Sequence, residues 1–306
     1  MEKNMNVNFE FLERRVLDAL DKTDLEYIRY ELKKLDKPSI ASGVGGSSVV
    51  SEFTSKVIRE KNGIITVNSE PRDFGYNRFN GFNNVVYCSY SGNNYGIDLS
   101  FNNALKHYLL SNNSFDDKDV TYLKYDTSID KERSFISLGA TLIPISVILN
   151  YYLNGDNTIL EELLQDYFYS FKVSDIYEIF TGLDTSTSSK YLESTLVESG
   201  IGIPIIHDKY SFCHGRSTSI LNHKAIAIYL DRGTNLDKLL LEELKPYYED
   251  IVVISSNYQD HIIADYEMLI KCMYLTRYIA KEKQKDLSKV EYNPIVKKLY
   301  KYNAGV

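Results

Sequence analysis

The sequence of 306 residues contains no tryptophan and only three cysteines. Because this number is odd and no two cysteines form a C-x-x-C pair, a disulfide framework and a cysteine-based zinc site are both disfavoured. The five histidines include no H-x-x-x-H pair, so we expect neither a metal nor a cofactor. Unpaired cysteines are typical of a reducing compartment, so the sequence predicts a cytoplasmic protein.

The sequence also lacks an excess of positive charge. It has 35 Lys and Arg against 42 Asp and Glu, a formal net charge of −7, which argues against nucleic acid as a partner. One small phosphate remains possible because it needs only local donors. The longest apolar stretch, 135–153, contains Pro144 and several small polar residues, and therefore predicts a buried helix instead of a membrane span. The first residues have no apolar core, so we expect no signal peptide and no membrane partner.

Candidate strands and helices alternate along most of the chain. Candidate strands cover 39–42, 64–68, 85–89, 122–125, 177–181, 203–207, 224–230 and 251–255. Candidate helices cover 47–61, 97–110, 137–153, 160–171, 189–199, 236–248 and 265–285. This alternation predicts an α/β fold in which helices cover both faces of parallel sheets.

Polar turn-forming residues at 154–157 mark the best candidate for a linker. We therefore expect an N-terminal helical segment, 1–35, a first α/β domain, 36–155, and a second domain, 156–306, which includes a basic C-terminal tail.

Glycine and serine fill the loop 42–48, between a candidate strand and a candidate helix. Glycines let a ligand approach the backbone, and the start of a helix supplies free N–H groups and partial positive charge. Gly45, Gly46 and Ser47 are therefore candidate phosphate ligands. A plain tight turn is one alternative, and a dinucleotide fingerprint is another, although Ser48 stands where that fingerprint has its third glycine.

A second polar loop, 89–94, also follows a strand, and it reads Ser89-Tyr90-Ser91-Gly92-Asn93-Asn94. Its hydroxyl and amide groups form a polar nest suited to phosphate oxygens, with Ser89, Ser91 and Asn94 as candidate ligands. Loops that follow neighbouring parallel strands leave the sheet at its carboxyl edge, where open α/β folds bind ligands. Two such loops favour one phosphate over a dinucleotide, for which Glu70 would be the candidate ribose ligand.

The two loops resemble the phosphate site of the sugar isomerase (SIS) domain family. The motif Gly43-Val44-Gly45-Gly46-Ser47 matches the family's Gly-x-Gly-x-Ser, and 89–94 matches its Ser-x-Ser-Gly-x-Thr, with Asn94 in place of Thr. The resemblance implies two SIS-type three-layer α/β/α sandwiches with parallel sheets, plus an N-terminal helix and a C-terminal tail. It also implies a sugar-phosphate ligand.

The second half is similar to double-SIS proteins such as the isomerase domain of glucosamine-6-phosphate synthase. Their His-Gly-Pro reads Cys213-His214-Gly215-Arg216 here, with Arg216 replacing Pro. The resemblance implies that His214 opens the sugar ring and that Glu198, sixteen residues upstream, moves the C1/C2 proton. It implies Lys298, or else Lys301, as a tail lysine near the substrate. It further implies a homodimer whose active site lies at the interface, with the histidine supplied by the partner subunit.

Isomerisation of an aldose to a ketose needs a ring opener and a base near neutral pH, roles that suit histidine and a partly desolvated glutamate. The sequence thus predicts binding of a phosphorylated sugar and its isomerisation or deglycase-type processing. The alternative is a non-catalytic sugar-phosphate sensor, favoured if Glu198 faces solvent. Glu198, His214 and Lys298 also have ordinary interpretations, as a helix-end carboxylate, a hydrogen-bonded histidine and a solvated tail residue.

Overall fold

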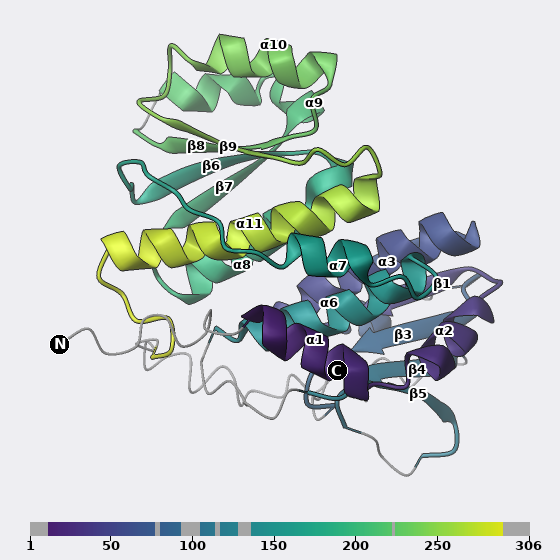
Figure 1. Cartoon of the computed structure of the whole chain (residues 1–306). Helices are drawn as coiled ribbons and strands as arrows, with labels where there is room; N and C mark the ends of the chain where they lie inside the picture. The colour runs from purple at the N-terminus through teal and green to yellow at the C-terminus, as the bar shows by residue number, and fades with distance from the viewer. Residues whose placement is uncertain are drawn as a thin grey trace. The chain divides into compact units, whose positions relative to one another are not determined.

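The computed structural model describes residues 12–76, 80–92, 105–113, 117–127, 136–221 and 224–289. Two compact units divide the chain, and each contains its own sheet (Figure 1). The first unit contains the described residues up to 127, those of 137–162 and Lys289, and the second contains the described residues of 163–288 with Ile136. Every strand pair in both sheets is parallel, which confirms the predicted α/β class.

The first unit has a five-stranded sheet in the order β2-β1-β3-β4-β5. Its strands are β1 (Ser39–Ser42), β2 (Thr66–Ser69), β3 (Asn84–Cys88), β4 (Lys106–Ser111) and β5 (Val120–Lys124). Its helices are α1 (Leu12–Lys22), α2 (Leu25–Lys33), α3 (Gly46–Asn62), α4 (Asp73–Tyr76) and α6 (Leu138–Tyr152), and α7 (Thr158–Leu163) spans the boundary between the units. Strands β1 and β3 are buried at every position, so their ends hold the loops 42–48 and 89–92 against the core.

Helix α6 is the buried helix that the apolar stretch 135–153 predicts. Its residues from Thr141 to Tyr151 are all buried, and Ser137 caps its first turn by accepting a hydrogen bond from the N–H of Ala140. Pro144 is the seventh residue of α6 and has no N–H to donate, so the helix lacks one i→i−4 hydrogen bond, to the carbonyl oxygen of Ala140. Among the described residues, no helix has both the length and the apolar character that crossing a membrane requires.

The second unit has a four-stranded sheet in the order β7-β6-β8-β9. Its strands are β6 (Ile176–Thr181), β7 (Ile203–Asp208), β8 (Ile226–Asp231) and β9 (Ile251–Ser255). Its helices are α8 (Ser186–Glu198), α9 (Lys209–Phe212), α10 (Asn235–Leu244) and α11 (His261–Glu282), with 3₁₀ turns η1 (Leu183–Thr185) and η2 (Arg216–Leu221). Helices α8 and α11 cover one face of this sheet, and α9 and α10 cover the other (Figure 1).

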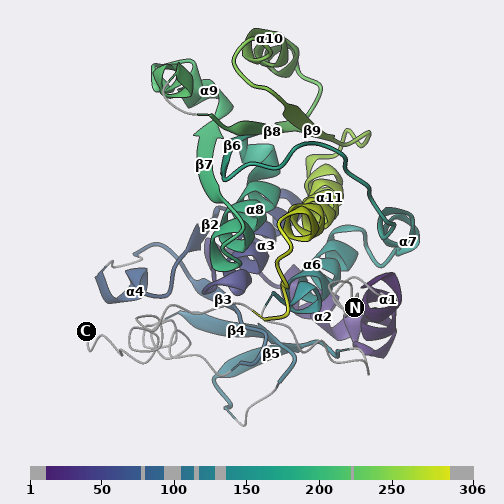
Figure 2. The same ribbon diagram turned by 90° about the vertical axis from the view of Figure 1, so that its left-hand side faces the viewer.

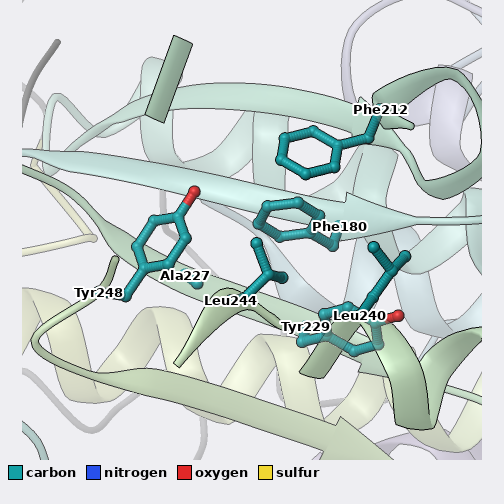
Figure 3. Close-up of a cluster of buried hydrophobic side chains, with 7 residues drawn as sticks. All are labelled: Phe180, Phe212, Ala227, Tyr229, Leu240, Leu244 and Tyr248. Atoms are coloured by element: carbon teal, nitrogen blue, oxygen red, sulfur yellow. The ribbon is translucent and has the colours of Figure 1, made fainter. Parts of the chain in front are cut away.

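Phe180 of β6 is at the centre of the core between the second sheet and helices α9 and α10 (Figure 3). Its ring stacks on Tyr229 at 5.8 Å and meets Phe212 and Tyr248 edge-on at 4.9 and 6.1 Å. Aromatic pairs at these separations add to the stabilisation that apolar burial alone provides. This core holds β6 and β8 against α10 and against the short helix α9 that follows β7.

Two predicted helices are wrong in part. Residues 106–110 of the predicted helix 97–110 belong to strand β4, where Tyr108, Leu109 and Leu110 are buried against β3, and 97–104 lie outside the described residues. The predicted helix 160–171 ends at Leu163, and the chain then runs on without regular structure. Both segments mix apolar and aromatic residues with polar and charged ones, and a short window of this kind fits either period.

Candidate functional site

The first polar loop turns sharply between β1 and α3. Gly45 has φ +58° and ψ −131°, a conformation that favours glycine, and α3 begins at the next residue. A β-carbon on Gly43 would lie 2.4 Å from the carbonyl oxygen of Ser47, so a side chain cannot fit at this position. Glycine at 43 therefore lets the loop fold closely over the first turn of α3.

The first turn of α3 presents unused backbone donors. The N–H groups of Ser47 and Ser48 donate to the carbonyl oxygens of Val44 and Gly45, at 3.1 and 2.8 Å. Within the part of the chain that the structure describes, the N–H groups of Gly45 and Gly46 have no acceptor. The first turn contains no acidic residue, and the helix of 17 residues adds the partial positive charge of its N-terminus. This arrangement suits an anion.

The second polar loop is hydrogen-bonded to the end of β4 and to the residues that follow it. The hydroxyl of Ser89 accepts a hydrogen bond from the N–H of Gly92 at 3.1 Å, which leaves its own proton available for a ligand. The carbonyl oxygen of Tyr90 accepts from the Ser111 hydroxyl at 3.3 Å, and that of Ser91 accepts from Asn113 Nδ2 at 2.8 Å. The loop is therefore held in place up to residue 92, whereas Asn94 lies outside the described residues.

The two loops leave neighbouring strands at the same edge of the sheet. Strand β1 pairs with β3, with Ser42 beside Tyr87. A β-carbon on Gly43 would lie 3.2 Å from the carbonyl oxygen of Cys88, so the backbones are in contact at the base of the loops. The Cys88 thiol is not a candidate nucleophile, because burial raises its pKa to about 12 and keeps it protonated.

This edge thus gathers five of the predicted phosphate ligands, which are Gly45, Gly46, Ser47, Ser89 and Ser91. Glu70, the ribose ligand of the dinucleotide alternative, follows β2 and forms an ion pair with Arg72 at 2.9 Å. A polar nest that combines backbone N–H groups with hydroxyls can hold the oxygens of one phosphate.

In the second unit, the corresponding helix start is filled by the protein itself. The carboxylate of Asp265, on α11, accepts hydrogen bonds from the N–H groups of Thr187 and Ser188 at 3.2 and 3.1 Å, and from the Ser188 hydroxyl at 2.6 Å. Asp265 is fully buried, so a negative charge already occupies the N-terminus of α8. A second internal pair, Lys209 with Asp237 at 2.5 Å, lies beyond the ends of β7 and β8. Of these two helix starts, that of α3 is therefore the one left open to an external anion.

Glu198 is the last residue of α8, at the helix end where the sequence predicts it. Its side chain is exposed, and it accepts a hydrogen bond from the Ser194 hydroxyl at 2.7 Å. His214 is also exposed, in the turn after α9, and its N–H donates to the carbonyl oxygen of Ser211 at 3.1 Å. The two predicted tail lysines, Lys298 and Lys301, lie outside the described residues.

Strand β7 separates Glu198 from His214 within one chain. Helix α8 ends shortly before β7 begins, and α9 follows the other end of β7 (Figure 2). Glu198 is the last residue of α8, and His214 lies in the turn after α9. The six residues of β7 span roughly 20 Å, because a strand rises by about 3.3 Å per residue. One chain therefore does not bring these two side chains together at one pair of substrate carbons.

Sequence reasoning missed a buried polar cluster in the second unit. Glu178 Oε2 lies 2.9 Å from His207 Nε2 and accepts the Tyr248 hydroxyl at 2.5 Å. Burial and the Glu178 carboxylate raise the pKa of Tyr248, which keeps this hydroxyl protonated as a donor. The sequence feature that could have revealed this cluster is Glu178, which lies inside the apolar run of β6, because a buried carboxylate requires polar partners. Within the described part of the chain, no three His, Cys, Asp or Glu side chains gather as metal ligands.

No model of a known protein family matches the sequence, and no curated protein sequence matches it either. Solved structures match nearly the whole chain. A candidate phosphosugar isomerase from Clostridium difficile 630 has a TM-score of 0.74 at 14% identity, and the match covers 97% of this chain and 98% of that one.

Two further matching structures are of proteins that are named as enzymes. Tagatose-6-phosphate ketose/aldose isomerase from Escherichia coli has a TM-score of 0.70 at 12% identity, with 95% of this chain and 96% of that chain covered. The C-terminal domain of glucosamine-fructose-6-phosphate aminotransferase from Francisella tularensis has a TM-score of 0.67 at 12% identity, with 94% and 98% covered. At such identities the likeness establishes the fold alone, and this chain shares the two-unit parallel α/β fold of these structures.

Proposed function

We propose that this protein binds a phosphorylated sugar at the paired loops of the first unit. The observation that carries the proposal is the pair of free N–H groups, on Gly45 and Gly46, at the start of a 17-residue helix beside a second serine-rich loop. Proteins of the same fold are named for sugar phosphates, among them the tagatose-6-phosphate isomerase. The phosphate would accept from these N–H groups and from the hydroxyls of Ser47, Ser89 and Ser91, with Asn94 as a further donor.

We further propose an isomerase-type reaction in a homodimer. His214 would assist ring opening, and Glu198 would take the proton from one of the carbons C1 and C2 and return it to the other, with Lys298 of the tail near the substrate. Both residues belong to one mechanism, yet β7 separates them within a chain. A site that uses both would combine Glu198 of one subunit with His214 of another, as the resemblance implies.

The second candidate function is a non-catalytic sensor of sugar phosphates. It is favoured by one observation: Glu198 is exposed in the single chain and already bonded to Ser194. Base catalysis by a carboxylate works best in a desolvated pocket, which an exposed helix end does not provide by itself. A sensor needs only the phosphate loops, whereas an isomerase needs a partner subunit that covers Glu198.

Thermal unfolding with and without ligands tests the binding step. Hexose, amino-sugar and pentose phosphates should each be compared with the unphosphorylated sugar, with inorganic phosphate and with NAD. A ligand at a hundred times its Kd stabilises the folded state by about 2.7 kcal/mol, which gives a clear rise in melting temperature. We expect this rise with at least one sugar phosphate. A rise with NAD alone would favour the dinucleotide alternative, and no rise with any sugar phosphate would refute the proposal.

A further inference from the structure

The second sheet ends at a strand whose counterpart in the first sheet is covered. In the first unit, β4 pairs on its outer side with β5, with His107–Ser111 beside Val120–Lys124. The second sheet follows the same order for four strands, but within the described residues nothing pairs with the outer side of β9. The chain passes from β9 directly to α11 without a fifth strand.

The backbone of β9 presents unused hydrogen-bonding groups at this edge. The carbonyl oxygen of Asp250 accepts from the N–H of Ala227 on β8, at 3.3 Å. Because backbone groups alternate in direction along a strand, those of Ile251, Val253 and Ser255 point away from β8. The carbonyl oxygen of Ser255 accepts from Lys271 Nζ at 2.6 Å, but no described residue bonds to the outward groups of Ile251 and Val253.

A groove of about 370 Å³ lies along this edge, between the end of α10 and β9. Apolar side chains and three carboxylates line it together with one lysine, and these residues are Leu241, Tyr248, Ile251, Val253, Glu242, Glu249, Asp250 and Lys245. Val253 is 45% exposed, and β9 itself has no charged residue of the kind that usually protects an edge strand.

Negative charge prevails in this groove. Lys245 pairs with Glu242 at 2.6 Å. Glu249 lies 3.9 Å from Lys224, whose side chain is 95% exposed, so this contact is loose. No described cation pairs with Asp250. A second copy of this chain would bring the same carboxylates to the edge and repel them, whereas a basic segment would be attracted.

We propose that the β9 edge binds an extended, basic peptide segment of a partner protein, which adds a fifth strand to the second sheet. The outward groups of Ile251 and Val253 would form the new ladder, the apolar groove would take alternate side chains, and Glu249 and Asp250 would bind lysine or arginine. This interaction is independent of the sugar-phosphate site.

A fluorescein-labelled synthetic peptide of alternating lysine and valine tests this proposal by fluorescence anisotropy on the full chain. Two matched peptides serve as controls, one with glutamate in place of lysine and one N-methylated on alternate backbone nitrogens. We expect both controls to bind at least about tenfold more weakly, because one loses the charge attraction and the other the ladder. If the wild-type protein bound the N-methylated peptide as tightly as the unmethylated one, the proposal would be overturned.

Variants of the protein locate the interaction. V253P removes one outward N–H and leaves the bonds to β8 in place, so we expect about tenfold weaker binding. The double variant E249Q/D250N should weaken binding and flatten its dependence on salt. L239K, on an exposed part of α10 outside the groove, should bind as the wild type does. Unchanged binding by the double variant would refute a basic partner. If the molar mass in solution were lower for V253P than for the wild type and the other variants, a second copy of the chain would occupy the edge, and the proposal would be overturned.

Discussion

Gly43 is the residue on which the shape of the first polar loop, 42–48, depends. In a G43A variant, the new β-carbon would lie 2.4 Å from the carbonyl oxygen of Ser47, so the loop would have to move off the first turn of α3. We therefore expect G43A to fold with reduced stability and to lose the rise in melting temperature with sugar phosphates. Calorimetric titration should show at least about a tenfold rise in Kd, since 1.4 kcal/mol of displaced contacts is sufficient.

The matched control for G43A is at the other end of the same helix. Gly63 caps α3 at φ +67°, and a β-carbon there meets nothing within 4 Å. G63A should lower the free energy of unfolding by about 1 kcal/mol through backbone strain alone and leave sugar-phosphate affinity unchanged. If G63A lowered affinity as much as G43A does, loss of global stability and not loop shape would explain both variants.

Local composition was sufficient to predict that the loop 42–48 leads from a strand into a helix, because glycine, serine and a helix start are close neighbours in the sequence. Gly45, Gly46 and Ser47 indeed lie at the first turn of α3. The carboxylate that fills the start of α8 could not be predicted in this way. Asp265 reaches Ser188 from 77 residues further along the chain, and such pairings appear only when the fold brings distant segments together.

At the scale of elements, the apolar and β-branched strands were predicted well, whereas β4 and the segment after Leu163 were predicted as helix. The segment after Leu163 illustrates the reason. Tyr167 and Tyr169 contact α11, whereas Phe168 between them is 88% exposed. This alternation has the period of an extended chain, but the segment pairs with a helix and not with a strand. Its structure thus depends on side-chain contacts with α11, which no local pattern encodes.

Tyr278 is the main anchor of this extended segment. Its hydroxyl donates to the carbonyl oxygen of Phe171 at 2.5 Å and accepts from the N–H of the same residue at 3.0 Å. We expect Y278F to lower the free energy of unfolding by about 1–3 kcal/mol, because two backbone groups lose their partner. Y274F is the control: the Tyr274 hydroxyl donates to the side chain of Asp166, an exposed residue, so its loss should matter less. Urea denaturation compares the two variants, and equal losses would contradict the anchoring role of Tyr278.

At the scale of the whole molecule, the chain repeats one parallel α/β architecture, and the two copies differ at the helix that follows their central strand. The first unit keeps an open helix start suited to an anion, and the second closes its own with Asp265. The second unit instead carries the residues predicted for proton transfer and ring opening, at opposite ends of β7. If these residues act together, each active site must draw on two subunits.

Subunit complementation tests this consequence directly. E198Q and H214N should each bind the sugar phosphate and fail to isomerise it, because each keeps the phosphate loops and lacks one group of the reaction. A heterodimer of the two variants, purified through two different tags, contains one site with both changes and one with neither, so it should regain about half of the wild-type activity. Heterodimers as inactive as their parents would exclude a shared site. Full turnover by E198Q would remove Glu198 from the mechanism, and binding without turnover by the wild type would leave the sensor function.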